Sequence, residues 1–338
     1  MSTPQTPRED AIMLTSEQVK KHAREMGADI VSIGTMDRFE GAPMQMDPRW
    51  MMPTAKSIIA MGFRHTRGVF RGIEEGTFFS SYSAMGYSSI NYIEQPYVLH
   101  EVGRLLEDAG CDVMPIPNNF PWNNINVTGW VPTEEAEKPN LAKANPPAAD
   151  RPAPDVFIQL RLAAYAAGLG EIGYSKMFLS KEFGPRQRIA VLLTDAELEP
   201  DPVLEPGTLC DNCMACVGAC TGKAIPTDKT VKVTIAGKEI EWADIDMNQC
   251  ATYFCGGNPA TNPFAITPED REAFGATVGR AQAHKVKPVY MYSRALEGAS
   301  GCIRACMIHL EKQGKLDCKF NHPFRKKATW RIPQEDAE

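Results

Sequence analysis

The stretch CDNCMACVGAC, residues 210–220, decides how this chain is organised. Its cysteines Cys210, Cys213, Cys216 and Cys220 have the spacing C-x2-C-x2-C-x3-C, which is typical of a loop that binds a [4Fe-4S] cluster. Three thiolates of such a run hold one cluster, and the fourth usually ligates a second cluster. A zinc site is the alternative, but zinc usually takes two separated C-x2-C pairs. The run therefore predicts a module that carries single electrons through two clusters.

A second cluster requires four further ligands, and the chain has ten cysteines in all. Cluster one is predicted to be held by Cys210, Cys213, Cys216 and Cys306. Cluster two is predicted to be held by Cys220, Cys250, Cys255 and Cys302. We expect Cys111 and Cys318 not to be ligands, since Cys111 lies in a predicted strand, where it packs as a small apolar residue. Thr221 stands where such runs usually have proline, but Gly222 lets the chain turn, so we expect ligation to persist.

Composition sets the broad class of the protein. The 338 residues allow two domains, and 43% hydrophobic with 23% charged residues is typical of a globular chain. The net charge of -6 does not favour nucleic-acid binding, and no apolar run approaches the ~18 residues that span a bilayer. The N-terminus shows neither a secretory nor a twin-arginine signal, so we expect a cytoplasmic protein whose cysteines serve metal or redox chemistry.

Hydrophobic periodicity predicts alternating helices and strands up to about residue 200. Helices are expected over 15–26 (with a Thr15–Gln18 capping box), 88–109 and 156–167, and strands over 29–34, 57–63, 111–117 and 188–195. A hairpin is expected over 230–245, turning at Ala236–Gly237. The domain prediction is a disordered segment 1–14, a domain 15–205, a cluster domain 206–317 and a packed tail 318–338. The proline-rich loop 118–154 either covers a site or is a surface insertion.

A second block strengthens the interpretation of the cysteines. AAGLGEIGYSKMFLSKEFGPRQRIAVLLTDAELEPD, followed closely by CDNCMACVGAC, resembles the epoxyqueuosine reductase and reductive dehalogenase superfamily. GADIVSIGTMDRF, SIIAMGF and YSAMGY fit the same resemblance more loosely, so that it covers roughly residues 15–310. Two departures mark a divergent member: Ala299 stands where the first cysteine of the second motif would be, and the helical-repeat tail of long epoxyqueuosine reductases is missing.

The resemblance implies an α+β protein, in which a nitroreductase-like α/β domain binds cobalamin in the base-off mode. A ferredoxin-like domain with two [4Fe-4S] clusters would feed electrons to the cobalt. A cobalt-mediated reduction needs a proton donor. In epoxyqueuosine reductases an aspartate before the AGLG block plays this part, and Asp155 is the nearest match; the alternative is that Asp155 caps a helix that starts near Val156.

In dehalogenases the proton donor is a tyrosine assisted by a basic residue. The candidates here are Tyr82, Tyr87 and Tyr92, with Arg64 and His65 at the end of the preceding strand as cofactor-binding residues. A neighbouring cation would lower the pKa of such a tyrosine. The alternative is that these tyrosines are core and rim aromatics.

The glycine-rich block supplies the other candidates for the cofactor site, because glycine lets a backbone approach closely. They are Gly168, Leu169, Gly170, Gly173, Ser175 and Lys176. The block follows a helical pattern rather than a strand, which excludes a dinucleotide-binding fingerprint. A solvated surface position is the alternative for Lys176.

Three functions remain open. The first is a cytoplasmic, cobalamin-dependent iron–sulfur reductase that acts on a small molecule or a modified nucleoside. Its electrons would come from a low-potential donor such as ferredoxin or flavodoxin, and a homodimer is a candidate assembly. The second is a cobalamin-free electron-transfer protein, and the third is a protein that carries or activates a corrinoid for another enzyme.

Overall fold

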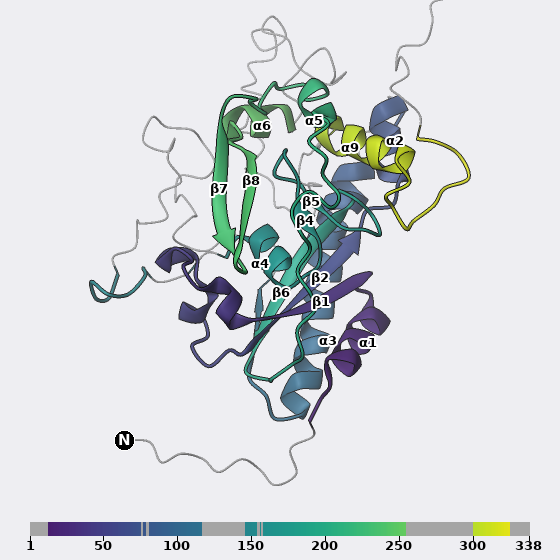
Figure 1. The fold of residues 1–338 in the computed structure, drawn as a ribbon. Helices are drawn as coiled ribbons and strands as arrows, with labels where there is room; N and C mark the ends of the chain where they lie inside the picture. Colours follow the sequence, from purple (N-terminus) through teal and green to yellow (C-terminus); the bar gives the residue numbers. More distant parts are fainter. Residues whose placement is uncertain are drawn as a thin grey trace, which may run out of the picture.

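A four-stranded sheet forms the centre of the protein (Figure 1). The computed structural model describes residues 13–75, 77–78, 81–116, 146–153, 156, 158–254 and 300–324. The strands are β1 (Ile30–Thr35), β2 (Ser57–Arg64), β3 (Val113–Ile116) and β6 (Gln187–Thr194). They lie in the order β1-β2-β6-β3, and each neighbouring pair is antiparallel. All four strands begin within two residues of their predicted positions.

Helices cover both faces of this sheet. Successive side chains of β2 point to opposite faces, and the side chains on both faces are apolar. Ile59, Met61 and Phe63 pack with helices α1 (Ser16–Met26) and α3 (Gln95–Asp108) in one core cluster. Ile58 and Ala60 pack on the opposite side with α4 (Leu160–Ala166). The predicted α+β class is therefore correct at the level of mixed helices and an antiparallel sheet.

The start of α1 follows the sequence prediction. Thr15 Oγ1 accepts the N–H of Gln18 at 3.2 Å, and Gln18 Oε1 accepts the N–H of Thr15 at 2.8 Å. This capping box satisfies two backbone donors that the first turn would leave unpaired. Gly27 ends the helix with φ 123, a conformation that glycine adopts readily. The predicted capping box is thus confirmed.

The predicted helix 88–109 is longer and less regular than expected. A π-helix, η4 (Tyr82–Glu94), precedes α3 and continues directly into it. Long π-helical stretches are rare and frequently occur at functional sites. Because η4 carries Tyr82, Tyr87 and Tyr92, the irregular turn geometry falls on the tyrosine candidates.

The glycine-rich block follows a shorter helix than predicted. The helix expected over 156–167 begins at Leu160, where the side chain of Gln159 accepts the N–H groups of Arg161 and Leu162 at 2.7 and 3.0 Å. The alternative role for Asp155, as a cap near Val156, is therefore wrong for this helix. Two short strands then pair in antiparallel fashion, β4 (Glu171–Ile172) and β5 (Phe178–Leu179).

The cysteine-rich part lies beside this core. It contains α5 (Ala215–Gly218), the hairpin β7 (Thr230–Ile235) and β8 (Lys238–Ala243), α6 (Met247–Phe254) and α9 (Ser300–Lys312). The hairpin turns at Ala236 and Gly237 with φ 51 and 70, as its sequence predicts. Sequence patterns missed α2 (Gly68–Glu75) and three short 3₁₀ turns, η1 (Met36–Phe39), η2 (Met44–Met46) and η3 (Pro48–Trp50).

Helix α9 joins the two parts of the molecule, since it packs on both α5 and α2 (Figure 1). A buried ion pair links Arg304 Nε of α9 to Glu74 Oε2 of α2 at 2.7 Å. A second pair links Arg67 Nη2 to Glu311 Oε2 at 3.1 Å. Buried ion pairs fix geometry more than they add stability, so α9 is held in one position on the first domain.

Within the described part of the chain, none of the helices combines the length and the apolar character needed to cross a bilayer.

Candidate metal centre

The cysteine run forms a tight loop that begins ahead of α5. Asn212 and Met214 have φ 54 and 58, so the backbone turns sharply between successive cysteines. Cys216 is buried, whereas Cys213 is exposed. The loop thereby directs several thiols to one place while one of its edges reaches the surface.

Helix α9 adds a fourth thiol from a distant part of the chain. One pocket is lined by Cys210, Cys213, Cys216 and Cys306, together with Gly173, Tyr174 and Leu310. These are the four cysteines that the sequence predicts for cluster one, and the fold brings all of them together.

Burial shapes the acid–base behaviour of these thiols. It raises the pKa of Cys306, and the nearby Cys210 adds to the shift. Burial also raises the pKa of Cys216. A thiol in such surroundings stays protonated at neutral pH unless a positive partner stabilises the thiolate. The donor set therefore fits a metal or cluster that takes thiolate ligands.

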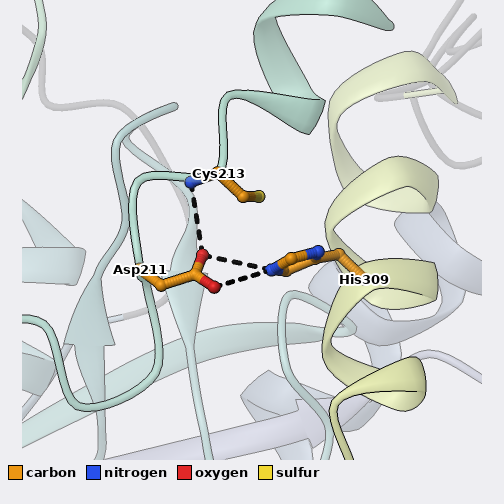
Figure 2. Close-up of side chains that lie close together, drawn as sticks. All are labelled: Asp211, Cys213 and His309. Carbon is orange, nitrogen blue, oxygen red and sulfur yellow. Dashed lines mark hydrogen bonds and ion pairs between the residues drawn. The ribbon is translucent and has the colours of Figure 1, made fainter.

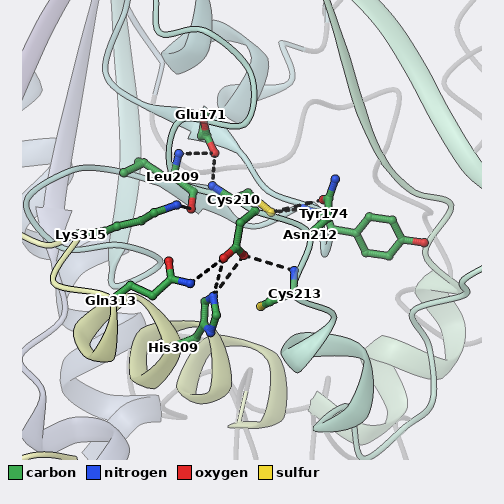
Figure 3. A network of polar contacts seen from close by, with 10 residues as sticks. Glu171, Tyr174, Leu209, Cys210, Asn212, Cys213, His309, Gln313 and Lys315 are labelled. Carbon is green, nitrogen blue, oxygen red and sulfur yellow. Dashed lines mark hydrogen bonds and ion pairs between the residues drawn. The ribbon is translucent and has the colours of Figure 1, made fainter.

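The glycine-rich block supports the first cysteine of the loop (Figure 3). Glu171 Oε1 accepts the N–H of Leu209 at 3.1 Å and also that of Cys210. The N–H of Tyr174 points at Cys210 Sγ, 3.4 Å away, and Lys315 Nζ donates to the carbonyl of Leu209 at 3.0 Å. Because Glu171 is 1% exposed, these contacts anchor the loop to the interior.

An aspartate inside the run connects the loop to α9 (Figure 2). Asp211 Oδ1 accepts the N–H of Cys213 at 3.2 Å, and His309 Nε2 lies 2.9 Å from Asp211 Oδ2. Gln313 Nε2 donates to the same Oδ2 at 2.7 Å. These hydrogen bonds hold the pKa of Asp211 well below its usual range, and the hydrogen bond from His309 has the largest effect.

A second group of cysteines lies next to the first. Cys220 and Cys302 pack against the same small core as Cys216, and Ala224 N–H points at Cys220 Sγ at 3.3 Å. Burial raises the pKa of Cys302 to about 12, with further contributions from its neighbours Cys250 and Cys220. Three of the four predicted ligands of cluster two thus lie near one another. Cys255 lies outside the described residues.

The glycines of the AGLGEIG block lie close to other atoms of the protein itself. A Cβ on Gly168 would lie 2.5 Å from the carbonyl oxygen of Pro202, and one on Gly170 would lie 2.0 Å from that of Leu179. A Cβ on Gly173 would lie 3.4 Å from Cys210 Sγ. Close packing inside the protein accounts for these glycines, and their assignment to a corrin stays a prediction.

The other candidates in that block lie between the cysteine loop and the hairpin. Leu169 is buried in the core. Lys176 adopts φ 61, and its Nζ lies 5.6 Å from the ring centre of Trp242. Burial lowers the pKa of Lys176, with Arg161 adding to the shift, so a freely solvated surface position does not describe this lysine. Burial raises the pKa of Cys216, and a side-chain hydrogen bond with Ser175 opposes part of this shift.

The tyrosine candidates meet a cation, Arg188, that sequence reasoning missed. The guanidinium of Arg188 lies 4.0 Å from the ring centre of Tyr87 and also contributes to the electrostatics of Tyr82. Burial raises the pKa of Tyr82, which is 2% exposed, and Arg188 opposes this shift. Tyr92 is 39% exposed.

The predicted cofactor-binding residues at and just after the end of β2, Arg64 and His65, have different surroundings. Arg64 forms an ion pair with Asp29 at 2.9 Å on the surface. His65 is 1% exposed and lies 5.5 Å from the rings of both Phe70 and Tyr82. Burial, followed by the charge of Arg188, lowers its pKa well below the usual value, so this imidazole is neutral.

Several buried polar groups surround the tyrosine region. Within the described part of the chain, polar side-chain atoms of Ser83, Ser88, Asn91 and Gln95 have no hydrogen-bond partner. Gln95 is fully buried and Asn91 is 2% exposed. Buried polar atoms without partners are rare in proteins and call for an explanation such as a bound polar ligand. Asp155 and the greater part of the loop 118–154 lie outside the described residues.

Sequence reasoning missed the supporting residues of the metal centre. Asp211 stands inside the cysteine run and His309 follows Cys306 by three residues, so both positions were visible in the sequence. Glu171 and Arg188 carried no such signal, because only the fold brings them to the loop and to the tyrosines.

Curated proteins match part of the chain. It is 35% identical over 114 residues to tetrachloroethene reductive dehalogenase of Desulfitobacterium hafniense, a stretch that covers 30% of this chain and 20% of that protein. A namesake from Sulfurospirillum multivorans is 29% identical over 113 residues, covering 30% and 22%. The chain thus spans about a fifth of the length of these relatives. No family model matches the chain.

Solved structures give a broader but weaker overlap. A reductive dehalogenase described with a B12-dependent mechanism is 18% identical, with a TM-score of 0.48, over 90% of this chain and 40% of its own. Epoxyqueuosine reductase from Bacillus subtilis is 14% identical, with a TM-score of 0.42, over 88% and 82%. The local sequence match to the curated proteins confirms the predicted resemblance to reductive dehalogenases over that stretch of the chain.

Proposed function

We propose that the chain is an iron–sulfur oxidoreductase in which two [4Fe-4S] clusters pass electrons to cobalamin for a reductive reaction. The observation that carries the proposal is the convergence of Cys210, Cys213 and Cys216 with the distant Cys306 around one pocket. Iron–sulfur clusters are held by such sets of cysteine thiolates. The raised thiol pKa values agree, because ligation to iron would supply the positive partner that each thiolate needs.

The second cluster rests on Cys220, Cys250, Cys255 and Cys302. Support comes from the proximity of Cys302 to Cys250 and Cys220, which adds to its raised pKa. Cys302 and Cys306 lie one turn apart on α9, so the two clusters would be close enough for electrons to pass between them. The ferredoxin-like character of this domain remains part of the proposal.

Cobalamin is proposed to bind beside η4, in a nitroreductase-like domain. The buried amides of Asn91 and Gln95 without partners support a polar ligand there, and the corrin ring carries amide side chains that could pair with them. Bound cobalamin would supply a cobalt centre that accepts electrons and reduces the substrate. Burial, followed by the charge of Arg188, lowers the pKa of Arg161, and Cys250, Cys302 and Tyr82 oppose this shift.

The chain's own residues would supply the proton. The guanidinium of Arg188 lies over the ring of Tyr87, which places a cation beside this proposed proton donor. For a halogenated substrate the balance is R–X + 2e⁻ + H⁺ → R–H + X⁻, with the electrons drawn from a low-potential donor such as ferredoxin or flavodoxin. Asp155 is the second proposed donor of the proton. The cytoplasmic location and a homodimer stay predictions.

An anaerobic reconstitution with iron, sulfide and cobalamin tests this proposal. We expect about eight iron atoms per chain, four for each cluster, and an ultraviolet–visible spectrum that retains the corrin after desalting. Tetrachloroethene and an epoxyqueuosine-modified stem-loop serve as trial substrates, with halide release and queuosine formation as readouts.

The outcomes separate the candidate functions. Iron without retained corrin would support the cobalamin-free electron-transfer protein and contradict the cobalamin part of the proposal. Retained corrin without turnover of either substrate would favour a corrinoid carrier. A Tyr87→Phe variant that keeps full turnover would remove Tyr87 as the proton donor, and Tyr97→Phe, in the exposed part of α3, is its matched control.

A further inference from the structure

Helix α9 carries Cys306 and His309 on the face toward the cysteine loop, and Gln313 follows directly after the last residue of the helix. Cys306 and His309 occupy positions i and i+3, so in a helix they point the same way. This face meets the cysteine loop, where both His309 and Gln313 bind the carboxylate of Asp211. Figure 3 shows His309 and Gln313 side by side, facing the loop.

The aspartate bridges the loop and the helix. Asp211 lies between two predicted ligands of cluster one, Cys210 and Cys213, and it accepts the N–H of Cys213 at 3.2 Å. The carboxylate thus ties the backbone of the loop to the helix that delivers the fourth thiol (Figure 2). We call Asp211, His309 and Gln313 the Asp211 clamp.

The two sources of thiols differ in how they are held. Cys210, Cys213 and Cys216 are joined by short chain segments, so the loop itself keeps them near one another. Cys306 is separated from Cys216 by ninety positions, and only the packing of α9 brings it to the pocket. Any shift of α9 away from the loop would therefore remove one ligand and leave three.

The carboxylate is well suited to prevent such a shift. A carboxylate can only accept hydrogen bonds, so Nε2 of His309 carries the hydrogen in the 2.9 Å contact. The side chains of His309 and Asp211 are 24% and 34% exposed, so the clamp lies at the edge of the pocket rather than beneath it. Its contribution is geometric, because charge-assisted hydrogen bonds are short and directional.

We propose that the Asp211 clamp is a set of positioning residues that holds Cys306 on cluster one and thereby keeps the cluster as [4Fe-4S]. The inference rests on the proposed binding of cluster one. Without the clamp, a one-electron oxidant would take one electron from [4Fe-4S]²⁺, and the iron that lacks its thiolate would leave as Fe²⁺. A [3Fe-4S]⁺ cluster would remain on the three loop cysteines, which balances charge and iron.

The test uses the full chain reconstituted with iron and sulfide, oxidised by ferricyanide. The readouts are the EPR signal of [3Fe-4S]⁺ and the iron released per chain. We expect Asp211→Ala and His309→Ala to form this signal at least tenfold faster than the unchanged protein, with loss of about one iron. His309→Gln keeps a donor at this site and is expected to restore most of the slow rate.

Two further variants give the upper and lower limits for the rate at which [3Fe-4S]⁺ forms. Cys306→Ser removes the ligand itself and gives the upper limit of the rate. Lys312→Ala changes an exposed residue of the same helix that makes no contact with Asp211, and it should behave like the unchanged protein.

Each outcome decides something. The role of the Asp211 clamp would be contradicted if both alanine variants formed [3Fe-4S]⁺ at the rate of the unchanged protein. It would also be contradicted if they lost all four iron atoms of the cluster at once. In both cases the proposed binding of cluster one would still stand. Absence of any cluster in the unchanged protein would overturn the proposed function and the clamp with it. If Asp211→Ala fails to fold, His309→Ala and Gln313→Ala carry the test, since both change only side chains that face the loop.

Discussion

Single residues in this protein show how the same residue type serves different purposes. Gly168, Gly170 and Gly173 look in sequence like a site for a close-bound ligand, but the atoms that approach them belong to Pro202 and to neighbouring chain segments. His65 looks like a surface ligand at the end of a strand, yet it is buried between Phe70 and Tyr82. Burial, which is a property of the fold, decides the role in each case.

The burial of His65 predicts a pH dependence of stability. Its pKa is lowered well below 6.5 in the folded state, so below pH 6.5 the unfolded chain binds a proton that the folded chain does not. The folded state therefore loses stability as the pH falls below about 6.5, by up to about 1.4 kcal/mol at pH 5.5 relative to neutral pH. Denaturant unfolding of the unchanged protein and of His65→Gln, at pH 7.5 and 5.5, measures this difference.

The substituted protein should lack this part of the acid sensitivity. His22, which is partly exposed, provides the control substitution. Equal pH dependence in His65→Gln and in the unchanged protein would contradict a neutral buried imidazole.

Among the secondary structure elements, α9 connects the cysteine-rich part to the first domain, since it packs on both α5 and α2. One face carries Cys302, Cys306 and His309 toward the cysteine loop, and Arg304 forms a buried ion pair with Glu74 of α2. A helix that is held from two sides has little freedom to tilt. The element therefore sets where the thiols lie relative to the first domain.

The Arg304–Glu74 pair predicts an asymmetric response to mutation. Replacing only one partner, in Arg304→Met or Glu74→Leu, leaves a buried charge and is expected to cost about 3–5 kcal/mol of unfolding free energy. Replacing both partners should cost clearly less than the sum of the two single changes, because no charge remains uncompensated. A double-mutant cycle of denaturant unfolding on the chain measures this coupling.

The exposed pair Lys232–Glu239 on the hairpin is the matched control, and its removal should cost at most about 1 kcal/mol. Additive losses for Arg304 and Glu74 would show that the two charges do not depend on each other.

At the scale of the whole molecule, the order of the cysteines along the chain differs from their grouping in space. Cys220 closes the sequence run but does not line the pocket of the first three cysteines, whereas the distant Cys306 does. Each proposed cluster would therefore take cysteines from both the loop and α9.

This grouping predicts distinct losses of iron. Cys220→Ser should abolish the EPR signal of one reduced cluster and about half of the bound iron, because Cys220 belongs to cluster two. Cys306→Ser should affect the other cluster. Redox titration followed by EPR distinguishes the two signals, and Cys111→Ser, which packs against the core behind the sheet, should change neither. Loss of the same signal in both variants would contradict the crossover.

The sequence alone determined the elements whose signals are local. The capping box of α1, the four sheet strands, the hairpin turn at Ala236–Gly237 and the cysteine spacing all depend on residues a few positions apart. The resemblance carried by the glycine-rich block was also readable, because it is a continuous stretch.

Only the tertiary structure decided which distant groups meet. Glu171 reaches the cysteine loop, Arg188 reaches Tyr87, and His309 reaches Asp211 because helices and strands far apart in the chain pack together. Periodicity identifies which face of an element is apolar, but it does not identify which element packs against that face. The contacts that position the thiols, and the burial that sets their pKa values, therefore arise from packing.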